Sequence, residues 1–145
     1  MIKAMIDTNV VIDYLDDRAP YADHAERLFD LCEQEELAGI LTASSMTDIY
    51  YIIRKSAGRE KALESLKLLF AVFEVAEVGK NDLLRAMEST ITDFEDALMA
   101  VCAKRSRAEY IITRNVRDFT NSPIPPMAPE DFLARFFPMQ TPSPS

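Results

Sequence analysis

Short runs of apolar residues alternate along the chain with longer segments in which apolar residues recur every three or four positions. The short runs predict strands buried on both faces, and the longer segments predict amphipathic helices. The predicted strands cover residues 2–6, 37–42, 72–78, 109–113 and 124–127. The predicted helices cover residues 8–16, 20–36, 44–58, 59–71, 81–90, 93–107 and 130–137.

The alternation of strands and helices is typical of an α/β domain with a mostly parallel sheet. The clearest helix is expected over residues 93–107, where the apolar stripe consists of Phe94, Ala97, Leu98 and Val101. The helix that ends near Gly58 begins beside Ser44 and Ser45, either of which can cap it. The pattern therefore indicates several helices packed on one parallel sheet.

The length of 145 residues suits one domain, which we expect over residues 1–137, followed by a disordered tail over 138–145. No apolar stretch approaches the roughly 18 residues that suggest a membrane span. The apolar start of the chain is short and lacks a small-residue cleavage site typical of signal peptides. These features predict a cytoplasmic protein that does not enter a membrane.

The net charge of −8 is unfavourable for non-specific binding to nucleic acid, because an acidic surface repels phosphate. Part of this charge can belong to carboxylates of a functional site, which a bound cation would offset. The acidic excess also makes a basic protein partner plausible.

Carboxylates recur where predicted strands end or predicted helices begin. Asp7 and Asp118 each follow a predicted strand, and Asp48 and Asp96 lie near the starts of two predicted helices. In open parallel sheets, ligands bind beyond the carboxyl ends of the strands. These elements can therefore aim all four side chains at one cleft.

Several carboxylates in one cleft repel each other unless protons or a cation neutralise them. The chain has one histidine and two cysteines, and Cys32 and Cys102 fall in apolar helical patterns that predict packing rather than a disulfide. Oxygen ligands alone favour Mg²⁺ or Mn²⁺. Such a cation can activate water and stabilise charge on a phosphate, so the pattern predicts phosphodiester hydrolysis.

Some of these acids also have an interpretation without a metal. The segment Thr92-Asp93-Phe94-Glu95 matches the capping-box pattern S/T-x-x-E, which by itself accounts for Asp93 and Glu95. Asp48 can complement a helix N-terminus, and Asp118 can be an ordinary turn residue.

Asp7 is the hardest acid to explain without a function, because a carboxylate that closes a buried strand is costly unless it pairs or binds something. Asn9 can orient Asp7 or cap the following helix. Farther along that helix, Asp13 is expected at a solvated end. Arg114 and Arg117 can draw phosphate toward the acids or pair on the surface.

Four segments in this order and spacing resemble the PIN-domain family, and within it the VapC-like toxin ribonucleases. They are Ile6-Asp7-Thr8-Asn9-Val10, Ser45-Met46-Thr47-Asp48-Ile49, Asp93-Phe94-Glu95-Asp96-Ala97 and Thr113-Arg114-Asn115-Val116-Arg117-Asp118-Phe119. The resemblance runs from Met1 to about Phe137. It implies about five mostly parallel strands with helices on both faces, frequent dimers, and an endoribonuclease that depends on Mg²⁺ or Mn²⁺.

Carried over by position, Asp7 and Asp96 correspond to the core metal ligands of the family. Asp48 stands where members commonly carry Glu, and Asn115 stands where many carry Asp. Asp118 would then be the remaining acidic partner. The residues expected to position the substrate or the site loop are Thr113, Asn115 and Asn9.

The sequence thus predicts a metal-dependent endoribonuclease that acts as the toxin of a type II toxin–antitoxin pair. Its expected partners are an RNA substrate, a cognate antitoxin and a second copy of the chain. The departures at Asp48 and Asn115 support an alternative, a catalytically degenerate PIN module that binds RNA or protein without cutting. Phosphatases of the haloacid-dehalogenase type also place an Asp after the first strand, but their second Asp would stand at Asn9.

Overall fold

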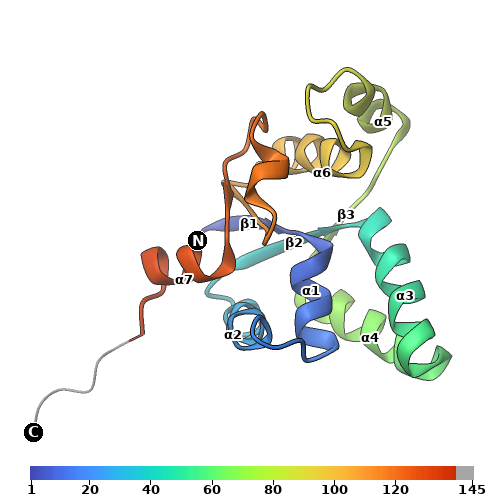
Figure 1. Cartoon of the computed structure of the whole chain (residues 1–145), viewed down its shortest axis with the longest axis vertical. Helices are drawn as coiled ribbons and strands as arrows, with labels where there is room; N and C mark the ends of the chain where they lie inside the picture. The colour runs from blue at the N-terminus through green and yellow to red at the C-terminus, as the bar shows by residue number, and fades with distance from the viewer. Residues whose placement is uncertain (140–145) are drawn as a thin grey trace, which may run out of the picture.

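The computed structural model describes residues 1–139, which form one sheet of five parallel strands with helices on both faces (Figure 1). The order of the strands in the sheet is β3-β2-β1-β4-β5. The strands are β1 (Lys3–Ile6), β2 (Ala38–Thr42), β3 (Glu74–Ala76), β4 (Tyr110–Ile112) and β5 (Pro126–Met127). The predicted fold class is confirmed, including the number and direction of the strands.

All seven predicted helices are present in the described part of the chain, with shifted boundaries. They are α1 (Thr8–Leu15), α2 (Ala22–Glu33), α3 (Ala43–Ala57), α4 (Arg59–Val72), α5 (Lys80–Met87), α6 (Phe94–Arg105) and α7 (Pro129–Phe136). A short 3₁₀ helix over Val116–Phe119, which the sequence did not predict, follows β4. Of the predicted tail over 138–145, residues 140–145 lie outside the described residues.

Three predicted boundaries were wrong for local reasons. Helix α2 ends at Glu33 rather than 36, because Glu35 adopts a positive φ of 58° that a helix cannot continue through. Strand β3 is shorter than 72–78, since α4 continues through Val72. The cap of α3 is neither predicted serine: Thr42 Oγ1 accepts a hydrogen bond from the Ser45 N–H at 3.1 Å.

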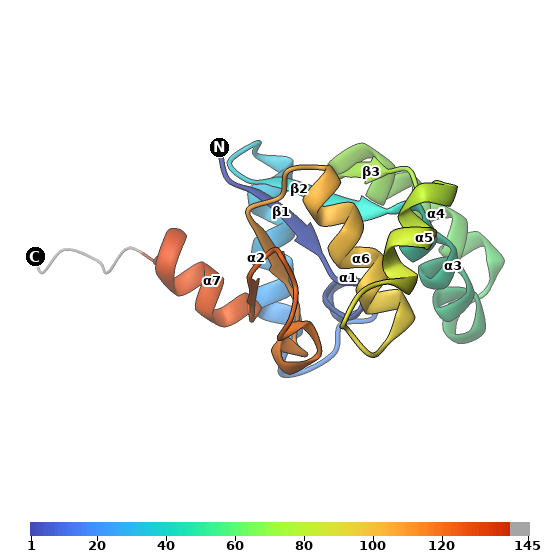
Figure 2. The ribbon, with the colours of Figure 1, turned by 90° about the horizontal axis from the view of Figure 1, so that it is seen from above.

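The core lies on both faces of the sheet because successive side chains of a strand point in opposite directions. Ala4, Ile6, Leu41 and Ile112 belong to the apolar cluster that includes residues of α1, α2, α3, α4 and α7. Met5, Ile40 and Ile111 belong to the cluster on the other face, with α5 and α6. Figures 1 and 2 show this division, with α6 lying across one face of the sheet.

The central strand β1 and its neighbour β4 end side by side, and this positions the candidate site. Ile6 of β1 is paired with Ile112 of β4, and the Asp7 N–H donates to the Ile112 carbonyl at 2.9 Å. Asp7 and Thr113, the residues that follow these two strands, are therefore neighbours at the carboxyl edge of the sheet.

Both cysteines lie in the apolar core. Cys32 and Cys102 are free and buried, as their apolar patterns predicted, and burial raises the pKa of the Cys32 thiol to about 12. Among residues 1–139, no helix is both long and apolar enough to cross a membrane.

Gly39 provides a test of the packing between β2 and its neighbours. A Cβ atom at this position would lie 2.6 Å from the Phe73 ring and 2.8 Å from Cys32 Sγ. We expect Gly39→Ala to lower the free energy of unfolding by about 1–3 kcal/mol, measured by urea denaturation, because an overfilled core must shift. Gly79→Ala is the control, since the nearest atom to its Cβ would be 3.8 Å away. Equal losses in the two variants would contradict this account.

Candidate active site

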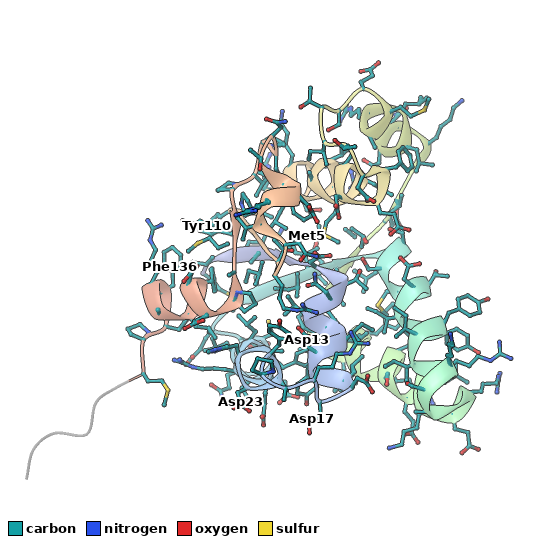
Figure 3. The ribbon with its side chains drawn as sticks, in the orientation of Figure 1. Met5, Asp13, Asp17, Asp23, Tyr110 and Phe136 are labelled. Carbon is teal, nitrogen blue, oxygen red and sulfur yellow. The ribbon has the colours of Figure 1, made fainter. Side chains whose placement is uncertain are left out.

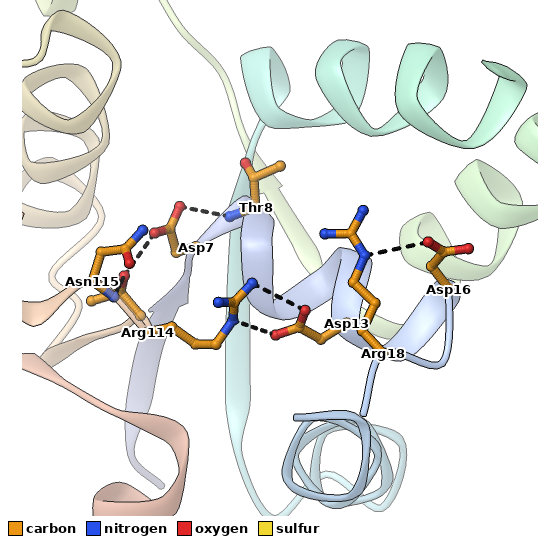
Figure 4. A network of polar contacts seen from close by, with 8 residues as sticks. Asp7, Thr8, Asp13, Asp16, Arg18, Arg114 and Asn115 are labelled. Atoms are coloured by element: carbon orange, nitrogen blue, oxygen red, sulfur yellow. Dashed lines mark hydrogen bonds and ion pairs between the residues drawn. The ribbon is translucent and has the colours of Figure 1, made fainter. Parts of the chain in front are cut away.

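Asp7 is a buried carboxylate, 8% exposed, at the point where β1 passes into α1. Its Oδ1 accepts a hydrogen bond from the Thr8 N–H at 2.7 Å, and its Oδ2 accepts one from Thr113 Oγ1 at 2.7 Å (Figure 4). Burial raises the pKa of Asp7, although these two hydrogen bonds oppose the rise. The carboxylate is thus fixed in orientation but electrostatically unfavourable.

The loop after β4 holds the second of those donors in place. Thr113 is fully buried, and its Oγ1 accepts a hydrogen bond from the Asn115 N–H at 3.0 Å while donating to Asp7. Thr113 therefore fixes the position of one Asp7 oxygen atom. Asn115 contributes to the same chain of hydrogen bonds through its backbone.

Three aspartates are buried in residues 1–139, and two of them are paired with arginine. Asp82 Oδ1 accepts from Arg105 Nε at 2.9 Å, which lowers the pKa of Asp82. Asp13 Oδ2 accepts from Arg114 Nε at 2.7 Å. Among the described ion pairs none involves Asp7, so Asp7 is the buried carboxylate without a cationic partner.

Two predictions about the ion pairs were wrong. Asp13, expected at a solvated helix end, is 1% exposed, whereas Asp17 and Asp23 lie at the surface (Figure 3). Arg114, expected to attract phosphate or pair on the surface, instead reaches Asp13. The one-dimensional pattern could not reveal this pair, because its members are 101 residues apart in the sequence.

Asp96 lies in the first turn of α6, close to several other acids. Burial, followed by the charges of Asp93, Asp7 and Asp118, raises the pKa of Asp96 to about 7. Its own N–H donates to the Asp93 carboxylate at 3.0 Å. Asp93 is therefore the N-cap residue of α6. The capping-box pattern had predicted Thr92 in that position.

Two adjacent clefts meet at Asp96. The first, of about 550 Å³, is lined by Asp7, Asp48, Glu95 and Asp96 together with the aromatic side chains of Tyr51 and Phe94. The second, of about 520 Å³, is lined by Asp93, Asp96, Asp118 and Arg117. Three of the four predicted acids thus share one cleft. Asp118 lies in the neighbouring one rather than at the same point.

Glu95 is the residue that the sequence interpretation missed, because it was assigned to the helix cap. It lies in the cleft with Asp48, and the charge of Asp48 is the largest cause of its raised pKa, ahead of burial and of the charges of Asp93 and Asp7. The signal in the sequence was its position directly before Asp96, at the start of a helix that borders the site.

The remaining predicted positioning residues differ in their surroundings. The Asn9 Oδ1 atom is buried and has no hydrogen-bond partner among the described residues, and the side chain that accepts at the start of α1 is Asp7. Asn115 is exposed and lines a separate hollow with Tyr21 and His24 instead of either acidic cleft. Asp118 is exposed in the 3₁₀ helix, but its charge still contributes to the raised pKa of Asp7.

The chemistry of these donors fits a hard divalent cation. The candidate ligands are all oxygen atoms, and in the described part of the chain Asp7 has no ion pair with a basic side chain. Burial, together with the charges of the neighbouring acids, raises the pKa of Asp96. As the side chains lie, however, no group of three or more histidine, cysteine or acidic residues within 1–139 is close enough to hold a metal ion. The charge and the donor atoms of these side chains therefore suit a divalent cation, whereas their present positions do not form a closed set of ligands.

A sequence model of the PIN domain matches residues 3–117, which is more than half of the chain. The chain belongs to the PIN-domain family, and the resemblance seen in its motifs is confirmed. Among characterised proteins, Ribonuclease VapC1 of Aquifex aeolicus (strain VF5) is 24% identical over 139 residues, covering 92% of this chain and 95% of that protein.

Solved structures of toxin–antitoxin proteins share the fold. VapBC2 of Rickettsia felis, bound to a promoter DNA fragment, aligns with a TM-score of 0.67 at 16% identity, over 88% of this chain and 98% of that one. DNA-bound VapBC of Salmonella typhimurium gives 0.67 at 20% identity, over 89% and 99%. VapC20 of Mycobacterium tuberculosis, a toxin that cleaves the Sarcin-Ricin loop, gives 0.61 at 12% identity, over 74% and 86%.

The raised pKa of Asp96 makes a prediction about stability in the absence of metal. A carboxyl group that is harder to ionise in the folded protein than in the unfolded chain stabilises the fold at low pH. That contribution is lost as the pH rises from about 4 toward the folded pKa of about 7. We therefore expect the free energy of unfolding of Asp96→Asn, relative to the parent, to increase between pH 4 and pH 7 in EDTA.

Urea denaturation at a series of pH values measures this difference, with Asp30→Asn on the exposed side of α2 as the control variant. A difference between Asp96→Asn and the parent that does not change with pH would contradict the electrostatic description of the site.

Proposed function

We propose that this chain is a metal-dependent endoribonuclease of the VapC toxin type, with its active site in the cleft between Asp7 and Asp96. The observation that carries the proposal is the state of Asp7: buried, held by two donors, and without the arginine that accompanies the other two buried aspartates. A protein keeps such an unfavourable carboxylate at a site where an external cation offsets it.

Asp7 and Asp96 would hold a Mg²⁺ or Mn²⁺ ion, with Asp48 and Asp118 completing the acidic surroundings. When bound, such a cation lowers the pKa of water and stabilises negative charge on a phosphodiester. Thr113 would keep one Asp7 oxygen in position, and the exposed Arg117 in the cleft of Asp118 would attract the RNA backbone. We also place Glu95 in the proposed site, as a carboxylate that shares the cleft with the short side chain of Asp48.

The relatives with this fold support a role in a toxin–antitoxin pair. Their structures include VapBC complexes, and the aligned region covers nearly the whole of those chains. We propose that a cognate antitoxin binds this chain and masks its acidic clefts, that the chain forms a homodimer, and that it acts on RNA in the cytoplasm. A basic segment on the antitoxin would suit the net charge of −8.

The direct test is cleavage of a structured fluorescent RNA by the purified protein with Mg²⁺ or Mn²⁺. We expect cleavage that EDTA abolishes and that Asp7→Asn lowers by more than about 100-fold, since even indirect changes at metal sites cost about 10–100-fold. Asp30→Asn is the matched control, because it removes one exposed acid that lines neither cleft. Mn²⁺ binding without cleavage of any RNA would favour the catalytically degenerate alternative.

Glu95→Gln tests the residue that the sequence interpretation missed. Removing its charge should weaken Mn²⁺ binding, measured by isothermal titration calorimetry, by about tenfold, as for other outer groups of metal sites. The same change should stabilise the metal-free protein at neutral pH, because it relieves repulsion with Asp48. Glu88→Gln, at the exposed end of α5, is the control. Unchanged Mn²⁺ affinity in Glu95→Gln would remove this residue from the site.

A further inference from the structure

An ion pair between the buried Asp13 and the half-buried Arg114 joins helix α1 to the loop that follows β4. Arg114 donates to both oxygens of Asp13, from Nε at 2.7 Å and from Nη2 at 3.2 Å. The Asp13 side chain is 1% exposed and that of Arg114 is 25% exposed. A bidentate pair of this kind fixes orientation as well as distance, because the planar guanidinium must align with the carboxylate.

The pair acts on the same loop that supports Asp7. Thr113 donates to Asp7 at the start of α1, and the next residue, Arg114, reaches Asp13 in the second turn of that helix. Figure 4 shows the pair of Arg114 with Asp13, and Asp7 at the start of the same helix. Thr113 is itself held on two sides, because its backbone N–H also donates to the Met127 carbonyl at 2.9 Å. The ion pair of Arg114 adds a separate anchor on α1, one residue farther along the loop.

The Arg114 guanidinium is engaged by protein groups along one edge and on one face, unlike that of its neighbour Arg117. Its guanidinium carbon lies 4.1 Å from the centroid of the Tyr21 ring, so one face is covered while its edge is held by Asp13. Arg117 is exposed in the second acidic cleft and has no ion pair among the described residues. Of the two arginines, the geometry leaves Arg117 to contact a phosphate.

We propose that Arg114 is a positioning residue of the site, which acts through Asp13 to hold Thr113 against Asp7. The inference rests on the proposed nuclease function for its effect on catalysis. In this arrangement the ion pair sets the direction in which the loop leaves β4. It thereby sets the hydrogen bond of the Asn115 N–H to Thr113 and the placement of Asp118 in the following 3₁₀ helix.

The decisive variant is Arg114→Lys, which keeps the positive charge but cannot form the bidentate pair. For a positioning role we expect kcat for RNA cleavage to fall by about tenfold or more, since small displacements of reacting groups cost up to about 100-fold, while KM changes less than about twofold. The dependence of KM on salt should stay as in the parent. Arg117→Met should do the reverse, raising KM and lowering its salt dependence.

A second variant separates positioning from stability. Asp13→Leu together with Arg114→Met replaces the pair by apolar groups, a change that often leaves buried sites as stable as before. We expect this variant to unfold near the urea midpoint of the parent yet to show the same loss of kcat. Arg18→Lys, which alters the exposed pair of Arg18 with Asp16, is the control and should leave cleavage unchanged.

Two results would overturn the proposal. Full kcat in the doubly substituted protein would show that the ion pair contributes only to packing. A raised KM with weakened salt dependence in Arg114→Lys would make Arg114 a direct phosphate contact.

Hydrogen exchange of the Asn115 amide, measured on the same variants without RNA, should become faster in Arg114→Lys. That readout distinguishes the two proposals: if the parent cleaves no RNA, the nuclease function fails, and the exchange rate still decides whether Arg114 holds the loop.

Discussion

The parallel pairing of β1 with β4 is the constraint on which the candidate site depends. Because Ile6 and Ile112 are paired, the residues that follow them leave the sheet at the same edge, and Thr113 can donate to Asp7. Asp7 and Thr113 are 106 positions apart in the sequence, so only the pairing of the two strands brings them together. Changing the register of these strands by one residue would turn every following side chain to the opposite face and dismantle the site.

The electrostatics of the protein follow from this arrangement. Buried carboxylates are unfavourable unless a positive group compensates their charge. Asp13 and Asp82 each form an ion pair with an arginine. At Asp7 the chain supplies two hydrogen bonds and the charge of Arg114, which pairs with Asp13 and not with Asp7. It also places Asp96 and Glu95 in the same cleft. The uncompensated charge is concentrated at one edge of the sheet, where ligands of parallel α/β proteins bind.

Much of the fold could be predicted from the chain because its signals are local. The apolar runs identified five strands, and the periodic segments identified seven helices of the described part. The errors fell at element ends, where a single backbone angle or hydrogen bond decides the outcome. Thr42 rather than a serine caps α3, and the positive φ of Glu35 ends α2 early.

The residue types of the candidate site could be predicted from the sequence, but their arrangement in space could not. The chain by itself determined that Asp7 and Asp118 follow strands and that Asp48 and Asp96 lie near the starts of helices. Short sequence patterns suffice for this, because they mark strand ends and helix caps. Tertiary structure alone decided that Asp118 borders a second cleft, that Glu95 joins Asp48, and that Arg114 is held by a buried Asp13. Each of these depends on contacts between elements that are far apart in the chain, where packing and the desolvation of charge decide the outcome. Neither packing nor desolvation produces a periodic pattern in the sequence.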